Sequence, residues 1–174
     1  MPTVFTHALA AGALASAVPA ARRARLAAWS AVCAVVPDLD VAAFRLGIPY
    51  EHMLGHRGLS HSVAFALVLG GLAAGLAFRR GERRAAALVL SLATLSHGVL
   101  DMLTDGGHGV ALWAPVSAER LFFPVRPIEV SPFASGFFSA RGLAVLQSEF
   151  AWVWLPALAL AAGAWAWRRR AARS

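Results

Sequence analysis

Five uncharged, apolar stretches divide this 174-residue chain and restrict what it can fold into. They cover residues 4–21, 26–37, 58–78, 85–100 and 150–167. A helix needs about 20 mostly apolar residues to cross a bilayer. The third and fifth stretches meet that length, the fourth meets it if it extends through Asp101, and the second crosses only if it borrows from RRAR (22–25). The pattern predicts an all-α integral membrane helix bundle with four to five spans, in a single domain over residues 1–174.

Composition and charge support the same class. The chain is 59% hydrophobic with a mean hydropathy of +0.62, which is too apolar for an ordinary soluble domain. Its formal charge of +7 could indicate nucleic acid. The arginines, however, form short clusters beside apolar stretches, which a membrane explains better, so no nucleic-acid partner is expected. The first stretch lacks a preceding positive segment, so we expect an uncleaved helix.

The arginine clusters predict the topology. RRAR (22–25), RRGERR (79–84) and RRRAAR (168–173) follow the first, third and fifth stretches and hold eleven of the sixteen arginines with one acid, Glu82. Cytoplasmic loops carry an excess of Arg and Lys. Five spans, with the N-terminus outside and the C-terminus in the cytoplasm, put all three clusters on the cytoplasmic side.

The same topology brings most histidines and acids to the outer ends of the helices. The candidate site residues gathered there are His7, Asp38, Asp40, His56, His61, His97, Asp101 and Asp105. His52 and His108 have no partner at a recognisable spacing and are expected at the surface. Ionisable residues near a membrane are costly and usually functional.

Two pairs of these residues have informative spacing. His97 and Asp101 lie four apart, so on a helix they share a face and can bind one ion or neighbouring ions. His56 and His61 lie five apart and do not share a helix face. Ser60 is a favourable N-cap for a helix starting at His61, which leaves His56 in the preceding loop.

The aspartates are expected in different settings. Pro37 should end the second helix just before Asp38 and Asp40, which then present two carboxylates from an extended or turn backbone. Asp105 continues the helix face of the His97 pair, but two glycines follow it and the helix is expected to fray. We therefore expect Asp105 to orient a ligand rather than to bind a metal itself.

Together these residues predict a metal site at the membrane interface. Nitrogen and carboxylate ligands suit a divalent metal, with zinc favoured and manganese or iron as alternatives. Four histidines and three aspartates exceed the needs of one tetrahedral ion, so one or two ions are expected, and two-metal centres commonly hydrolyse phosphoesters. Asp101 and Arg57 are the candidate catalytic residues, with the Arg57 guanidinium holding a substrate phosphate.

Each pattern also has a purely structural interpretation. PDLD (37–40) could be a helix stop with turn aspartates, and HRGLSHS (56–62) a capped helix start. His97 and Asp101 could form a buried hydrogen-bonded pair, and His7 could be an interfacial polar residue. Their common placement at one side of the membrane favours the metal site.

The motifs resemble a known family. TH (6–7), PDLD (37–40), HRGLSHS (56–62), SHGVLDMLTDGG (96–107) and LWAP (112–115) are similar, in that order, to the YdjM-like family of predicted LexA-regulated, membrane-bound metal-dependent hydrolases. The resemblance implies a multi-pass protein of the bacterial inner membrane. It also implies these metal ligands: His7, Asp38, Asp40, His56, His61, His97 and Asp101.

The remaining expectations concern the substrate and the rival functions. Residues 106–148 are predicted as a long non-cytoplasmic interfacial loop, either a lid that contacts membrane lipid or a surface loop with interfacial aromatics. The favoured function is metal-dependent hydrolysis of a phosphoester or lipid. The alternatives are a non-catalytic metal-binding membrane protein with a structural or envelope-stress role, and a transporter. Transport predicts ionisable residues near the bilayer midplane rather than at helix ends.

Overall fold

The computed structural model describes residues 1–18, 23–132 and 134–173, and all regular elements in them are helical. Residues 19–21 of the first apolar stretch, and Arg22, lie outside the described residues. The α-helices are α1 (Val4–Ala17), α2 (Arg23–Val35), α3 (Ala42–Arg45), α4 (Val63–Ala77), α5 (Arg83–Met102), α6 (Ala140–Glu149) and α7 (Leu155–Ala171). Four short helical turns complete them, namely η1 (Val36–Val41), η2 (Leu59–His61), η3 (Ala134–Phe137) and η4 (Phe150–Trp154). The predicted all-α class is confirmed.

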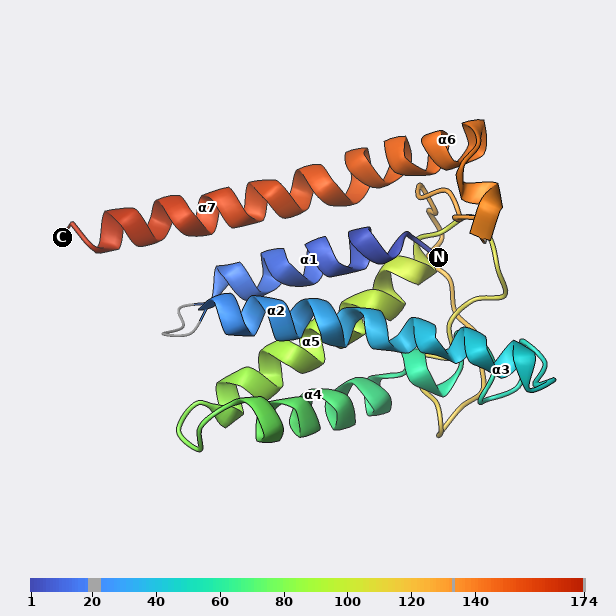
Figure 1. Ribbon diagram of the computed structural model, residues 1–174, viewed down its shortest axis with the longest axis horizontal. Helices are drawn as coiled ribbons and strands as arrows, with labels where there is room; N and C mark the ends of the chain where they lie inside the picture. Colours follow the sequence, from blue (N-terminus) through green and yellow to red (C-terminus); the bar gives the residue numbers. More distant parts are fainter. Residues whose placement is uncertain (19–22, 133, 174) are drawn as a thin grey trace.

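The long helices lie side by side, and successive ones run in opposite directions (Figure 1). Helix α1 packs against α2, α5 and α7, and α5 also packs against α2 and α4. The segment between α5 and α6 has no long helix and lies at the end of the bundle where α1 begins and α5 ends.

In the described part of the chain, three helices are long and apolar enough to cross a membrane. They are Arg23–Arg45, which joins α2, η1 and α3, then Arg83–Met102, and Ala140–Ala171. Helices α1 and α4 are shorter apolar helices of 14 and 15 residues. The second apolar stretch, which is short in the sequence, therefore belongs to a continuous 23-residue helix, because η1 carries the helical backbone past Pro37.

The expected loop over residues 106–148 is shorter than predicted. Residues 140–149 form α6, and η4 joins α6 to α7 without a break, so the irregular segment ends near residue 139. Val145 and Glu149 are buried on this helix while Leu143 and Gln147 are exposed. The two buried residues are four apart, and so are the two exposed ones, so the helix buries one face. The short length and polar residues of this segment do not by themselves predict a helix.

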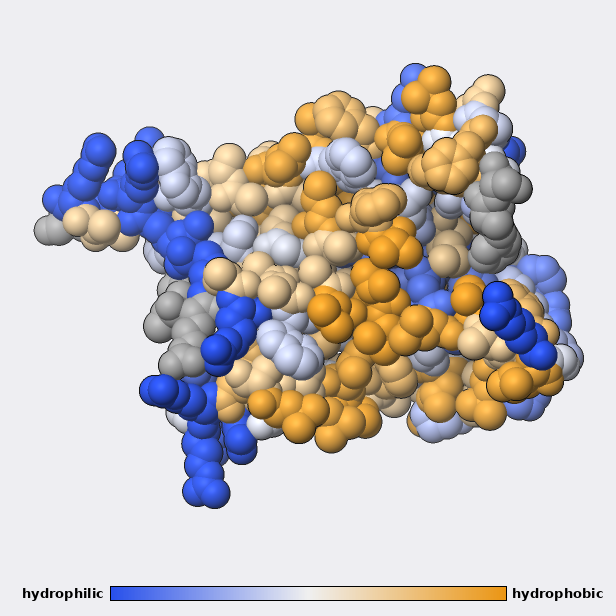
Figure 2. All heavy atoms as spheres, in the orientation of Figure 1, coloured by the Kyte–Doolittle hydropathy of each residue, from blue (hydrophilic) through white to orange (hydrophobic). Residues whose placement is uncertain are grey.

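Small residues pack the bundle, and large apolar residues cover its outside. Gly70 of α4 lies so close to Ser91 of α5 that a Cβ there would meet the Ser91 backbone nitrogen at 2.5 Å. Close approach through small residues is typical of membrane helices. Leu72 and Leu76 are 62% and 84% exposed, and Figure 2 shows apolar side chains over the middle of the molecule.

The two ends of the bundle differ in chemistry. Figure 2 shows hydrophilic residues gathered at the end that carries the C-terminus and the turn between α4 and α5. The arginine clusters fall there, and some of them close helix ends. Arg83 Nε donates to the carbonyl oxygen of Phe78 at 3.0 Å, and Arg168 donates to the carbonyl oxygen of Ser16. The predicted convergence of the clusters on one end is confirmed.

Candidate metal centre

The seven predicted ligands meet at the opposite end of the bundle. Each side chain is at most 8% exposed. They come from α1, from η1, from the turn before α4 and from α5, namely His7, Asp38 and Asp40, His56 and His61, and His97 and Asp101. Four segments far apart in the sequence thus build one cluster.

The backbone that carries the aspartates takes one of the two predicted forms. Helix α2 ends at Val35, and residues 36–41 form the 3₁₀ turn η1, which is the turn rather than the extended alternative. Proline fits the first turn of a helix, where its missing N–H costs no hydrogen bond. The 3₁₀ turn directs Asp38 and Asp40 into the cluster while the chain continues into α3.

The predicted N-cap of α4 is also wrong. Helix α4 starts at Val63, and Ser62 is its N-cap, accepting a hydrogen bond from the Phe65 backbone N–H at 3.1 Å. Ser60 instead donates from its hydroxyl to Asp40 Oδ2 at 2.5 Å. His61 therefore lies in the short turn η2, one residue before the N-cap.

Three atoms at the centre have the spacing of metal ligands. His61 Nε2 lies 3.0 Å from His97 Nε2 and 3.4 Å from Asp101 Oδ2. The Nε2 atom of His97 lies 3.9 Å from Asp101 Oδ2. Ligands of a tetrahedral zinc ion, at bonds of about 2.0–2.1 Å, lie about 3.3 Å apart. These three side chains therefore fit a zinc-sized ion. Asp38 Oδ1 lies beside them, 3.2 Å from His97 Nε2 and 4.0 Å from His61 Nε2.

Hydrogen bonds outside this set fix which histidine nitrogen can bind. The His97 Nδ1 atom lies 2.7 Å from the carbonyl oxygen of Ala34, which can only accept, so Nδ1 carries the proton and Nε2 has a lone pair. Asp40 lies 3.2 Å from His61 Nδ1 and 2.5 Å from His56 Nδ1. A carboxylate that orients a ligating histidine in this way is a common feature of metal sites.

Positive charge is stabilised where His61 lies. The His61 ring lies between two carboxylates, with Nε2 3.4 Å from Asp101 Oδ2 and Nδ1 3.2 Å from Asp40 Oδ2. The same carboxylates can stabilise a metal cation while the imidazole is neutral, because metal and proton compete for the nitrogen.

Buried polar atoms without hydrogen bonds provide the test of fit. Within the described residues, both ring nitrogens of His7 and both carboxylate oxygens of Asp38 and of Asp101 are buried with no hydrogen bond, although Asp101 Oδ2 has an ion pair with Arg57 Nε at 2.9 Å. Leaving such atoms unsatisfied costs about 1–3 kcal/mol each. Coordination to a divalent cation can satisfy one ring nitrogen of His7 and an oxygen of each carboxylate, so the residues present fit a metal ion.

Three groups of side chains could hold an ion, and they overlap. They are His7 with Asp38 and His97, Asp38 with His56 and His61, and His61 with His97 and Asp101. The His97 ring stacks on His7 at 3.7 Å between centroids and has only Nε2 left for a metal. The first two groups share Asp38, and each shares one histidine with the third, so two ions would have to share a ligand residue, whereas one ion can use the His61, His97 and Asp101 group.

Arg57 is committed to groups within the protein. Its Nη1 donates to the carbonyl oxygen of Gly106 at 2.9 Å and its Nη2 to Thr104 Oγ1 at 3.1 Å. Its Nε forms an ion pair with Asp101 Oδ2 at 2.9 Å, and the residue is 1% exposed. Arg57 has a φ of 60° and Gly107 a φ of 87°; a Cβ on Gly107 would lie 2.7 Å from Arg57 Nη1.

The residues expected outside the ligand set also lie outside it in the structure. The side chain of His108 is 56% exposed beside Glu51, and His52 is exposed, as predicted. Asp105, which was expected to orient a ligand, instead accepts a hydrogen bond from the Val130 N–H at 2.8 Å and so holds the segment between α5 and α6.

Sequence reasoning missed two polar residues. Arg120 donates to the carbonyl oxygens of Tyr50 at 2.8 Å and His56 at 3.1 Å, which ties the long segment to the ligand-bearing turn. Glu149 is fully buried beside the start of α1. The sequence contained one signal for Glu149, which is an acid directly before the last apolar stretch (150–167).

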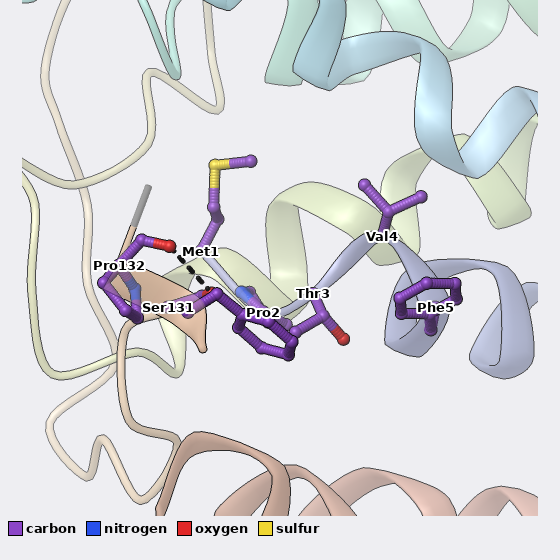
Figure 3. Close-up of a pocket in the computed structure, with 8 residues that line it drawn as sticks. Met1, Pro2, Thr3, Val4, Phe5, Ser131 and Pro132 are labelled. Atoms are coloured by element: carbon purple, nitrogen blue, oxygen red, sulfur yellow. Dashed lines mark hydrogen bonds between the residues drawn. The ribbon is translucent and has the colours of Figure 1, made fainter. Parts of the chain in front are cut away.

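A shallow apolar cavity opens at the same end of the molecule (Figure 3). Its volume is about 290 Å³, and its walls are residues 1–5 with Ser131, Pro132 and Phe137. Ser131 N–H donates to the carbonyl oxygen of Met1 at 3.0 Å and closes one side of it. His7 lies one helical turn beyond Thr3, so the cavity lies at the end of α1 that carries His7.

An apolar helix bundle with a buried histidine–aspartate cluster at one end defines an integral membrane protein with a candidate metal centre. The chain belongs to the YdjM inner membrane protein family, whose model matches residues 1–172. It is 40% identical to the inner membrane protein YbcI of Escherichia coli (strain K12), over 97% of this chain and 100% of that protein. No solved structure was found to match the chain. The resemblance seen in the motifs is thus confirmed.

Proposed function

We propose that this chain is a metal-dependent hydrolase of the inner membrane that acts on a phosphoester or lipid. The observation that carries this proposal is the set of buried His7, Asp38 and Asp101 atoms without hydrogen-bond partners. Such atoms are costly in a purely structural core, and they lie among imidazoles in the donor set that zinc prefers.

The residues have distinct roles in this proposal. His61, His97, Asp38 and Asp101 hold a divalent ion, zinc in preference to manganese or iron. A bound divalent ion supplies Lewis acidity, which acidifies water and polarises a phosphoryl or carbonyl group. Asp40 orients His61, and Arg57 fixes Asp101 through their ion pair. His56 and His7 serve as further ligands.

We place the centre on the non-cytoplasmic side. Five crossings with a cytoplasmic C-terminus put the arginine clusters inside and the cluster of ligands outside. In this arrangement the segment 106–139 lies over the centre as an interfacial lid. The apolar cavity beside Thr3 supports a lipid substrate, because it lies at the end of α1 that carries His7 and its walls are mostly apolar.

Metal content is the first test. The detergent-purified wild type is expected to carry one or two equivalents of zinc by elemental mass spectrometry. The double variant His61→Ala, Asp101→Asn should lose at least nine-tenths of it. The matched control His52→Ala, Asp105→Asn changes the same residue types outside the cluster and should retain the metal. No metal in the wild type after incubation with zinc, manganese and iron would sink the proposal.

Turnover is the second test. The metal-loaded wild type is expected to hydrolyse at least one member of a panel of phosphoesters and phospholipids. Asp101→Asn should lower the rate by about 100-fold or more, and chelation should abolish it. A loaded protein inactive on the whole panel would favour the second candidate function.

A structural metal is that second candidate. The observation in its favour is burial, because every ligand side chain is at most 8% exposed. Closed sites are typical of structural zinc. Under this function Asp101→Asn lowers the thermal stability in proportion to the metal it loses, and the loaded wild type shows no turnover.

A further inference from the structure

A buried carboxylate lies within a candidate span, outside the metal cluster. Glu149 is 0% exposed and lies in the 32-residue helix that joins α6, η4 and α7. A carboxylate inside a membrane-spanning segment is expensive and is retained where it has partners and a task.

The partners of Glu149 all lie at the start of α1. Thr3 donates to this carboxylate from both its backbone N–H and its hydroxyl, the latter at 2.7 Å. Thr6 donates from its hydroxyl at 2.7 Å, and Trp154 Nε1 donates to that hydroxyl at 2.6 Å. One carboxylate and one indole thus bind two threonines about 145 residues away in the sequence.

The π turn explains how Glu149 and Trp154 reach the same threonine. Residues five apart on an α-helix point about 140° apart. The residues of η4 (Phe150–Trp154) form a π-helix, whose wider turn brings the two side chains closer to one face. Pro156, just after it, has no N–H and disfavours a regular turn before it. Such turns frequently occur at functional sites.

The threonines held by Glu149 belong to the turn that carries His7. The His7 backbone N–H donates to the Thr3 carbonyl oxygen at 3.2 Å, and Thr6 directly precedes His7. The His7 ring stacks on His97, and its Nε2 lies 3.7 Å from Asp101 Oδ1. Helix α1 has six alanines and no charged residue, so its hydrogen bonds to Glu149 are directional contacts that its small apolar side chains do not supply.

We infer that Glu149, together with Trp154, is a positioning residue of the metal centre: it fixes the first turn of α1 and thereby sets the place of His7. The inference rests on the proposed metal centre and assigns the C-terminal helix a task in it. Glu149 itself does not coordinate the ion.

Cobalt loading of the full-length protein in detergent tests this inference. The visible absorption of Co²⁺ depends on the number and geometry of its ligands. His7→Ala and Glu149→Ala are each expected to change the cobalt spectrum in the same way and to weaken cobalt binding by about 10-fold or more. The double variant should add no further change, because both changes remove the same ligand.

Two variants of the same segment separate positioning from general packing. Trp154→Phe removes the indole donor and should shift the spectrum in the same direction, but less. The matched control Trp152→Phe changes a 60% exposed tryptophan of the same π turn and should leave the spectrum unchanged. Glu149→Gln keeps an acceptor oxygen and should restore part of the wild-type spectrum.

The outcomes that overturn the inference are distinct from failure of the proposed function. A folded Glu149→Ala protein with the wild-type cobalt spectrum overturns it. Weakened binding with a spectrum unlike that of His7→Ala also overturns it, since Glu149 would then act on packing alone.

A wild type that binds no cobalt refutes the proposed function, and a metal-free measurement then decides the inference. In a Cys33→Ala, His7→Cys background, Glu149→Ala should raise maleimide labelling at position 7 at least 10-fold. Unchanged labelling overturns the inference.

Discussion

Arg57 determines the charge balance of the cluster at the scale of single residues. Three buried or nearly buried carboxylates, those of Asp38, Asp40 and Asp101, belong to the cluster, and the Arg57 guanidinium pairs with the last of them. With neutral imidazoles the group carries a net charge of −2, which one divalent cation balances. Charges of this kind are stable under a membrane surface only when they are paired.

Replacing Arg57 by lysine is expected to damage the centre although the charge is kept. A lysine ammonium is a point charge and cannot bond Gly106 and Thr104 while it also pairs with Asp101. We expect metal affinity to fall about 10–100-fold and the free energy of unfolding to fall by about 3 kcal/mol. Metal titration and thermal unfolding in detergent measure the two effects.

The control for this prediction is Arg126→Lys. Arg126 is exposed, and its guanidinium lies over the Phe122 ring away from the ligands. The substitution Arg126→Lys should leave metal affinity unchanged. If Arg57→Lys instead binds metal normally and loses only turnover, Arg57 contacts the substrate, as its position in HRGLSHS first indicated.

At the scale of helices, the contact between α4 and α5 is the clearest case. Gly70 lies against the backbone of Ser91, whereas the neighbouring Gly71 has no atom within 4 Å of where a Cβ would lie. Both glycines lie in the same apolar helix, so the sequence cannot tell which one packs. Helix α5 carries His97 and Asp101 at its far end, and its position depends on this contact.

The two neighbouring glycines should respond oppositely to alanine. Gly70→Ala forces α4 and α5 apart and is expected to lower the free energy of unfolding by about 1–3 kcal/mol. Gly71→Ala adds a methyl group on the outside and should be neutral or stabilising by up to about 1 kcal/mol. Unfolding monitored by circular dichroism in a denaturing detergent compares them. Equal losses would show that α4 and α5 do not meet through Gly70.

The whole molecule has a basic end and an end that carries the candidate metal ligands. Every arginine cluster falls at the first, and all seven predicted ligands fall at the second (Figures 1 and 2). Positive residues favour the cytoplasmic side, so this separation orients the molecule as a unit.

Single cysteines introduced in a Cys33→Ala background test the orientation. An impermeant maleimide applied to intact spheroplasts is expected to label His52→Cys and to leave Gly81→Cys unlabelled. Permeabilised membranes should label both, since both positions are exposed. Labelling of Gly81→Cys in intact spheroplasts would reverse the topology and place the metal centre in the cytoplasm.

The sequence determined the properties that depend on local pattern. Uninterrupted apolar stretches specify helices because a bilayer leaves no other partner for backbone polar groups. Arginine clusters at alternate junctions specify the two ends. The spacing of His97 and Asp101 specifies a shared helix face, and the structure confirms it with 3.9 Å between Nε2 and Oδ2.

The tertiary structure decided which polar atoms meet. The length of the helix that begins at Arg23 depends on a 3₁₀ turn past Pro37, and the roles of Ser60 and Asp40 depend on the chain folding back between residues 40 and 60. Glu149 reaches Thr3 only because α7 packs along α1. Contacts between distant segments depend on the position of whole helices, which no local spacing encodes, so the hydrogen-bond partners of buried groups appear only in the folded chain.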